Sequence, residues 1–271
     1  MRKKQVGEER IEDQNWEERV MVEKPSQPLI DVVMLTKNSE RILKECVQSI
    51  YKNVPVRRLI IIDGFSTDNT IKIINGFQRQ HENIVLIQQE GTRGMARQRA
   101  LSEVETDWFM FVDSDVILCD GWFEKVKNIM DDDRVGAIWG MEIWSVLLNS
   151  RMLGLFERVN LKIFNRRGGT HDLLVRREAI KGIRIPPHLH TYEDSFIRSW
   201  IHKNGYRVIP VYDPYCIHYR PENVWTVSGS MNLIIQDIRY AIHHPQLILS
   251  YAFFTLIVLQ QIILRKIKRT L

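Results

Sequence analysis

Short apolar runs alternate with amphipathic segments along the first half of the chain. Four runs of mostly β-branched, aliphatic or aromatic side chains have the length of strands: residues 29–35, 58–62, 84–87 and 108–112. Between them, apolar side chains recur at helical spacing, most clearly within residues 43–50, 67–80 and 94–104. Repeated strand–helix units with continuously apolar strands indicate a parallel sheet that helices cover on both faces. The pattern therefore predicts an α/β fold.

We expect residues 29–222 to form one main domain. Both ends of the chain differ from it in their content of charged and apolar side chains. Residues 1–28 carry many charges and few apolar side chains. They cannot bury enough surface to offset the entropy of ordering, so we expect a charged, flexible arm. Residues 223–271 begin with an amphipathic pattern and include the most apolar stretch of the chain, residues 247–264.

This apolar stretch predicts an association with a membrane. As a helix it would be about 27 Å long, slightly less than the ~30 Å hydrocarbon core of a bilayer. The basic side chains within residues 265–269 suit an anionic lipid surface. We expect residues 223–271 to lie in or against a membrane surface, with a helix packed in a dimer as the alternative.

Charge and cysteine content exclude several classes of protein. The chain has 38 Lys and Arg residues and 33 Asp and Glu residues, and the resulting net charge of +5 does not indicate nucleic-acid binding. Cys46, Cys119 and Cys216 lie far apart, which favours neither a disulfide framework nor a zinc module. No apolar run of signal-peptide type follows Met1. We therefore expect a protein of the reducing cytoplasm, attached to the cytoplasmic face of a membrane.

Polar residues follow three of the four predicted strands at the point where each strand ends. Thr36 and Asn38 follow the first strand, Asp63 follows the second, and Asp113 and Asp115 follow the fourth. In a parallel sheet these positions share one edge, where ligands bind. Residues two apart in an extended chain point the same way, so the last two acids can face one hard cation, Mg²⁺ or Mn²⁺. The alternative is a set of ordinary turns and helix caps.

Four ordered motifs resemble those of the family 2 glycosyltransferases, and the resemblance covers about residues 29–220. They are T-K-N at residues 36–38, D-G-F-S-T-D at 63–68, G-M-A-R-Q-R-A at 94–100 and D-S-D at 113–115. Residues 174–179 and 192–194 add two further matches. The resemblance implies a GT-A-type fold, a Rossmann-like, mostly parallel sheet with helices on both faces. The apolar pattern of residues 223–271 adds hydrophobic C-terminal helices to this expectation. The resemblance also implies a nucleotide-diphosphate sugar as donor, either a UDP- or a GDP-sugar, and a divalent metal.

The resemblance also implies roles for individual residues. By similarity, Thr36, Asn38 and Asp63 belong to the nucleotide site, and Arg97 lies beside the base or the diphosphate. Asp113 reaches the ribose or the metal, and Asp115 binds the metal directly. His218 is a further metal or diphosphate ligand, with a packed or surface histidine as the alternative.

Asp194 is the candidate general base, which would take the proton from an acceptor hydroxyl as that group attacks the anomeric carbon and inverts it. The alternative is that Glu193 and Asp194 only favour the dipole at the start of a helix. His171 and Asp172 are expected near the acceptor if their loop borders the site, and an ordinary turn is the alternative. The adjacent pair Arg166–Arg167 could meet an anionic acceptor, or simply be solvated.

The favoured function is sugar transfer to a hydroxyl of a lipid-linked or polymeric glycan. A polyprenyl-phosphate acceptor is the first alternative, although an ionised phosphate needs no base and Asp194 therefore favours a hydroxyl. A sugar-phosphate nucleotidyltransferase would carry a glycine-rich loop after the first strand, where residues 36–38 supply none. A non-catalytic nucleotide-sugar binding protein could tolerate the loss of the base. The donor sugar, the base, the acceptor and the oligomeric state stay open, because the loops within residues 139–167 decide the first three.

Overall fold

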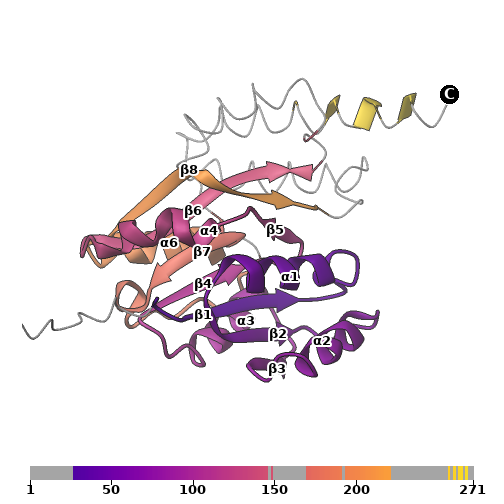
Figure 1. The fold of residues 1–271 in the computed structure, drawn as a ribbon, viewed down its shortest axis with the longest axis horizontal. Helices are drawn as coiled ribbons and strands as arrows, with labels where there is room; N and C mark the ends of the chain where they lie inside the picture. Colours follow the sequence, from indigo (N-terminus) through magenta and orange to yellow (C-terminus); the bar gives the residue numbers. More distant parts are fainter. Residues whose placement is uncertain are drawn as a thin grey trace, which may run out of the picture.

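One sheet organises the molecule. The computed structural model describes residues 27–145, 148, 169–190, 193–220, 256, 259–260, 262–264 and 266–267. Within these residues the sheet has eight strands in the order β3-β2-β1-β4-β7-β6-β8-β5 (Figure 1). The strands are β1 (Ile30–Thr36), β2 (Val56–Asp63), β3 (Ile84–Gln88), β4 (Trp108–Val112), β5 (Val116–Leu118), β6 (Val135–Trp144), β7 (Asp172–Arg176) and β8 (Arg207–His218).

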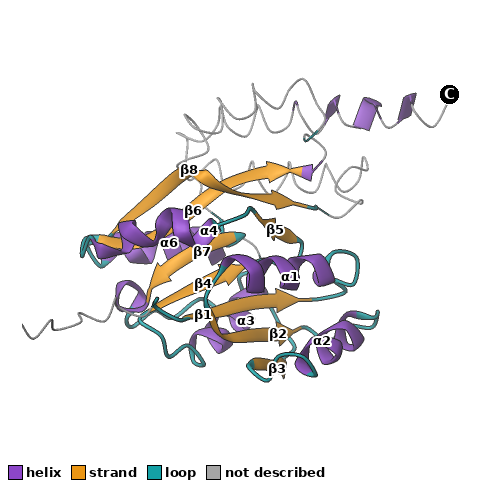
Figure 2. Cartoon of the chain, viewed as in Figure 1, coloured by secondary structure: helices purple, strands orange, loops and turns teal. Residues whose placement is uncertain are grey.

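Helices pack on both faces of this sheet, as the sequence predicts (Figure 2). The α-helices are α1 (Leu43–Asn53), α2 (Thr70–Gln78), α3 (Arg93–Leu101), α4 (Trp122–Val126) and α6 (Glu193–Lys203), and the 3-10 helices are η1 (Lys127–Asp131) and η4 (Arg177–Ile180). Successive side chains of a strand point to opposite faces. Val32 and Met34 therefore enter the core beneath α1, α2 and α4, whereas Val33 enters the core that contains Ile197 and Ile201 of α6.

The two halves of the sheet differ in strand direction. The pairs β1–β2, β2–β3 and β1–β4 are parallel, as the strand–helix alternation predicts. Strand β7 runs antiparallel to both β4 and β6, and β5 runs antiparallel to β8. The sheet is therefore mixed. The alternation of strands and helices in the sequence does not predict the antiparallel strands of its second half.

The two predicted terminal regions lie almost entirely outside the described residues. For residues 1–28 only Gln27 and Pro28 are described, and for residues 223–271 only scattered positions from Leu256 to Ile267. Among the residues that the structure describes, no helix has the length and apolar character needed to cross a membrane. The flexible arm, the hydrophobic C-terminal helices and the membrane association stay predictions.

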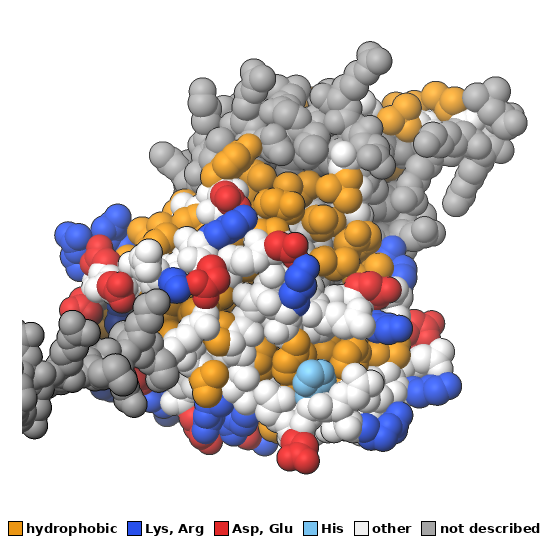
Figure 3. Space-filling view, viewed as in Figure 1, with side chains coloured by type: hydrophobic (Ala, Val, Ile, Leu, Met, Phe, Trp, Pro, Cys, Tyr) orange, Lys and Arg blue, Asp and Glu red, His pale blue; other side chains and the backbone are white. Residues whose placement is uncertain are grey.

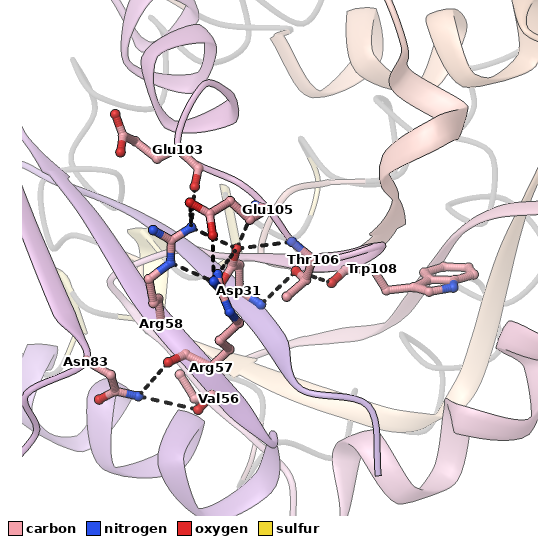
Figure 4. A network of polar contacts seen from close by, with 9 residues as sticks. All are labelled: Asp31, Val56, Arg57, Arg58, Asn83, Glu103, Glu105, Thr106 and Trp108. Carbon is pink, nitrogen blue, oxygen red and sulfur yellow. Dashed lines mark hydrogen bonds and ion pairs between the residues drawn. The ribbon is translucent and has the colours of Figure 1, made fainter. Parts of the chain in front are cut away.

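A buried carboxylate fixes the start of β1, at the end of the strand away from Thr36. Asp31 is fully buried and forms ion pairs with Arg57 and Arg58 of β2, at 3.2 and 3.3 Å (Figure 4). It also accepts hydrogen bonds from the backbone amides of Glu105 (2.8 Å) and Thr106 (3.3 Å), just before β4. Burial acts to raise the pKa of Asp31, but the Glu105 amide and Arg58 outweigh it and lower that pKa. One ionised side chain therefore joins three neighbouring segments of the sheet.

Replacing Asp31 by alanine should lower the free energy of unfolding by about 3 kcal/mol at pH 7, because two arginines lose their buried partner. A group whose pKa is depressed on folding stabilises the fold above its unfolded pKa. The difference between wild type and Asp31→Ala should thus shrink as the pH falls below about 4. Urea denaturation at pH 7 and pH 3 measures both values. Asp107→Ala, which removes an exposed carboxylate nearby, is the control, and an equal Asp31→Ala effect at both pH values would contradict the ionic role.

Candidate functional site

The carboxyl ends of β1 and β2 hold a buried carboxylate in a fixed orientation. Thr36 and Asp63 are paired in register across these strands, and both are buried. The Thr36 hydroxyl donates to Asp63 Oδ1 (2.9 Å), and Ser66 donates to the same carboxylate through its backbone amide (2.9 Å) and its hydroxyl (2.5 Å). A carboxylate only accepts hydrogen bonds when ionised, so this group is suited to meet an N–H or O–H of a ligand.

Asn38 joins the loops that follow these two strands. Its backbone lies in the left-handed region, with φ of 50°. Its amide N–H donates to the Ser66 hydroxyl (2.9 Å), and its side-chain oxygen accepts from the Thr67 amide (2.8 Å). The observed role of Asn38 is therefore to hold the two loops together, and its contact with a nucleotide stays a prediction.

Arg97 of α3 contacts the predicted site residue Asp113 at the end of β4. Its guanidinium is almost fully buried and lies over the ring of Phe111, 4.7 Å from the centroid. Nη2 donates to Asp113 Oδ1 (2.8 Å) and to the Thr170 hydroxyl (2.5 Å). Its buried Nε and Nη1 have no hydrogen-bond partner within the described part of the chain. Because buried donors are normally satisfied, these two nitrogens are the unsatisfied donors of the Arg97 side chain.

Asp113 is ionised in this setting. Its side chain is 30% exposed, so it is open to the site as well as bound to Arg97. Burial acts to raise the pKa of Asp113, but the positive charges of Arg97 and His218 outweigh it and lower that pKa. The carboxylate therefore keeps its charge at the edge of the sheet.

Asp115 and His218 meet because β5 pairs with β8. Val116 lies opposite His218 in this antiparallel pair, and the Tyr219 amide donates to the backbone oxygen of Asp115 (2.8 Å). Asp115 Oδ1 lies 3.1 Å from His218 Nε2. Burial acts to lower the pKa of His218, but Asp115 and Glu142 outweigh it and raise that pKa to about 9. The two side chains form an ion pair here. Two neighbouring ligands of an octahedral cation at about 2.1 Å lie about 3.0 Å apart, so the spacing of this pair would also allow both to bind one cation.

His171 and Asp172 lie inside the protein beneath these residues. Both are buried, and His171 Nδ1 lies 2.7 Å from Asp172 Oδ1 and 3.4 Å from the sulfur of Cys216. Asp172 Oδ2 accepts from the Trp122 indole (2.9 Å) and from the Gly140 amide (3.1 Å). Two ligands of a tetrahedral zinc ion are about 3.3 Å apart, so the 2.7 Å distance fits a shared proton better than a metal. Both side chains are buried, and their place near an acceptor stays a prediction. Arg166–Arg167 lie outside the described residues.

The start of α6 lies close to Arg97. Glu193 is buried, and burial raises its pKa although Arg97 acts to lower it. Asp194 is partly exposed, and its Oδ1 accepts from the Ser195 amide at 2.7 Å. The loop before α6 is held by the start of α3, because the Gly94 amide donates to the Leu189 oxygen at 2.8 Å. A Cβ at Gly94 would lie 2.6 Å from a backbone oxygen of this loop, so the close approach requires glycine.

Sequence reasoning missed Glu142, which contacts His218 Nδ1 at 2.6 Å. The available signal is a single acid within an otherwise apolar run, G-M-E-I-W at residues 140–144. It also missed Thr170, because a threonine in a loop carries no local sign of a contact with Arg97.

Residues 31–170 match the glycosyl transferase family 2, which is more than half of the chain. The chain belongs to the glycosyl transferase family 2. The transferase is 27% identical to the poly(ribitol-phosphate) beta-glucosyltransferase of Bacillus spizizenii over 122 residues, which are 41% of this chain and 19% of that protein.

Two solved structures share the fold of the transferase. S. aureus TarS 1-349 in complex with UDP-GlcNAc superimposes with a TM-score of 0.57 at 21% identity, covering 72% of this chain and 59% of that one. The mannosyltransferase PcManGT of Pyrobaculum calidifontis in complex with GDP-Man and Mn2+ gives 0.61 at 19% identity, covering 79% and 65%. These similarities confirm the predicted GT-A-type fold. The chain spans less than two thirds of the length of each of these three proteins.

Proposed function

We propose that this glycosyltransferase moves a sugar from a nucleotide-diphosphate sugar to a hydroxyl of a polymeric or lipid-linked glycan, with inversion at the anomeric carbon and with a divalent metal. The observation that carries the proposal is the pair Asp115–His218, with ligand atoms 3.1 Å apart, at the edge of the sheet that also holds Arg97 and Asp113. The relative from B. spizizenii, by its name, acts on a phosphate-linked polymer.

The metal site would consist of Asp115 and His218, with Asp113 as a further oxygen ligand or as a ligand of a metal-bound water. Carboxylate oxygens suit Mg²⁺ and Mn²⁺, and an imidazole nitrogen is compatible with Mn²⁺. When bound, such a cation would stabilise the negative charge that develops on the diphosphate leaving group. PcManGT holds Mn2+ together with its donor, which agrees with this assignment.

The nucleotide would bind along β1, β2 and α3. Asp63, held by Thr36 and Ser66, would accept a hydrogen bond from the base or from a ribose hydroxyl. The buried N–H groups of Arg97 would donate to an oxygen of the base or of the diphosphate. TarS binds UDP-GlcNAc and PcManGT binds GDP-Man, so both bases occur on this fold.

Asp194 would act as the general base. It is partly exposed at the start of α6, directly after Glu193, whose carboxyl group is close enough to Arg97 for the charge of Arg97 to act on its pKa. An acceptor could approach the sugar there. The Asp194 carboxylate would take the proton of the attacking hydroxyl, which raises the nucleophilicity of that oxygen. A base is needed by a hydroxyl but not by an ionised phosphate, and this favours a hydroxyl acceptor.

Calorimetric binding of a panel of UDP- and GDP-sugars, with Mn²⁺ and with EDTA, tests the donor half of the proposal. We expect one donor to bind at least about tenfold more tightly with Mn²⁺, since a cation held by Asp115 and His218 would attract the negatively charged diphosphate. Donor hydrolysis under the same conditions gives the turnover. Absence of a metal-dependent interaction with every donor would contradict the proposal.

The acceptor would be met at an anionic membrane surface. The described residues near the carboxyl terminus expose apolar side chains (Figure 3). Leu256, Ile263 and Ile267 are at least half exposed, and Lys266, next to Ile267 in the sequence, is exposed too. Apolar and basic side chains together favour anionic lipid. In a flotation assay, the full chain should rise with phosphatidylglycerol vesicles and rise less with neutral vesicles. The double variant Ile263→Asp, Ile267→Asp should remain in the bottom fraction with both. Equal flotation of both proteins would contradict this part of the proposal.

A further inference from the structure

Glu142 is a charged residue in the middle of an apolar strand. It lies on β6, where its side chain is 19% exposed. Within the described part of the chain, its Oε1 accepts from His218 Nδ1 (2.6 Å), Arg220 Nη2 (2.9 Å) and Trp144 Nε1 (3.0 Å). Burying an ionised group costs free energy unless the group is paired, so a glutamate at this position is expected to have a structural or functional role.

The hydrogen bond to Glu142 determines which nitrogen of His218 is free. Of the two ring nitrogens, Nδ1 lies 2.6 Å from the Glu142 carboxylate and Nε2 lies 3.1 Å from Asp115 Oδ1. In the neutral ring that a metal requires, a proton on Nδ1, directed at the Glu142 carboxylate, leaves the lone pair on Nε2, on the side of Asp115. A histidine that binds a metal through one nitrogen usually donates the other N–H to a carboxylate or a carbonyl in this way.

Three strands hold the arrangement in place. The parallel pairing of β6 with β8 sets Glu142 opposite Cys216 and Trp144 opposite His218. The antiparallel pairing of β5 with β8 sets Asp115 beside the same histidine. Because Glu142 and His218 stand on paired strands and Asp115 directly precedes β5, the backbone limits how far the ring of His218 can turn.

We propose that Glu142 is a positioning residue of the metal site, which orients His218 and keeps its Nε2 available to a divalent cation. The inference rests on the proposed function, because it takes His218 as a metal ligand. It assigns a role to a residue that does not itself touch donor, acceptor or metal. The loss of such a carboxylate weakens metal binding typically by about 10- to 100-fold.

Mn²⁺ titration followed by the electron paramagnetic resonance signal of free Mn²⁺ tests the inference without an activity assay. We expect Glu142→Ala to weaken Mn²⁺ binding by about 10- to 100-fold and Glu142→Gln, which keeps an oxygen acceptor for Nδ1–H, to weaken it less. Glu178→Gln, which removes an exposed acid paired with Lys181, should bind Mn²⁺ like wild type. Binding of the nucleoside diphosphate without metal should be unchanged in Glu142→Gln, whereas a general distortion of the site would weaken it.

A double variant separates an action through His218 from a separate effect of Glu142. In a His218→Ala background, Glu142→Ala should cause no further loss of Mn²⁺ affinity, because the ring it orients is gone. If Glu142→Ala binds Mn²⁺ like wild type while Asp115→Ala does not, the inference fails and the proposed metal site stands. If wild type itself binds no Mn²⁺, the metal part of the proposed function fails, and the inference fails with it.

Discussion

Replacing Asp115 by alanine should lower the metal-dependent turnover by at least about 100-fold, because several kcal/mol of charge stabilisation at the leaving group depend on the cation. The side chain is 29% exposed and lies just before β5, so its loss removes no core packing. The melting temperature should therefore stay within about 2 °C of wild type. Donor turnover measured as a function of Mn²⁺ concentration, together with a thermal melt, gives both quantities.

Asp120→Ala is the matched control for this prediction. Asp120 is also an exposed acid close to β5, and its ion pair with Lys52 lies on the surface, so its removal should change neither quantity. Turnover of Asp115→Ala equal to that of wild type, at every Mn²⁺ concentration, would exclude Asp115 as a metal ligand. A large fall in the melting temperature would instead assign the residue to the stability of the β5–β8 pair.

Replacing Asp194 by asparagine should lower the transfer rate by about 100- to 10,000-fold and leave donor affinity unchanged, because only proton removal from the acceptor is lost. Asparagine has the same shape and keeps an oxygen for the hydrogen bond from the Ser195 amide (2.7 Å). The start of α6 should therefore keep its structure. Single-turnover transfer to an acceptor and calorimetric donor binding separate the two effects.

The outcome for Asp194→Asn also distinguishes the acceptor class. If the transfer rate is unchanged, the acceptor supplies its own negative charge, as a phosphate does, and the proposed hydroxyl acceptor is wrong. If donor affinity falls together with the rate, Asp194 contributes to the donor site. Only a fall in rate at constant donor affinity supports the general base.

The edge of the sheet explains how a metal site and a nucleotide site share one small region. β1 and β2 deliver Thr36 and Asp63 as a pair in register, and α3 delivers Arg97 to the end of β4. The β5–β8 pair then adds Asp115 and His218 from segments far apart in the chain. Rigid strands hold these groups in place before any ligand binds, which is the condition for strong electrostatic stabilisation.

The sequence alone determined the first half of the fold and its candidate site residues. The period of apolar side chains is a local property, so the strand–helix units and the parallel pairing of β1, β2, β3 and β4 could be predicted. The clustering of Asp63 and Asp113 at one edge followed, because parallel strands end on the same side. The order of the motifs then indicated the family, which the match over residues 31–170 confirms.

Only the tertiary structure decided the second half of the sheet and the contacts that depend on it. The antiparallel β7 and the long β8 pair with strands distant in sequence, and no local period records such pairing. Glu142 and His218 are 76 residues apart, so their contact depends on the register of β6 and β8. The burial of His171 and Asp172 likewise depends on neighbours from other strands. Local patterns specify which segments form strands, whereas side-chain pairing across a sheet depends on register, which the whole fold sets.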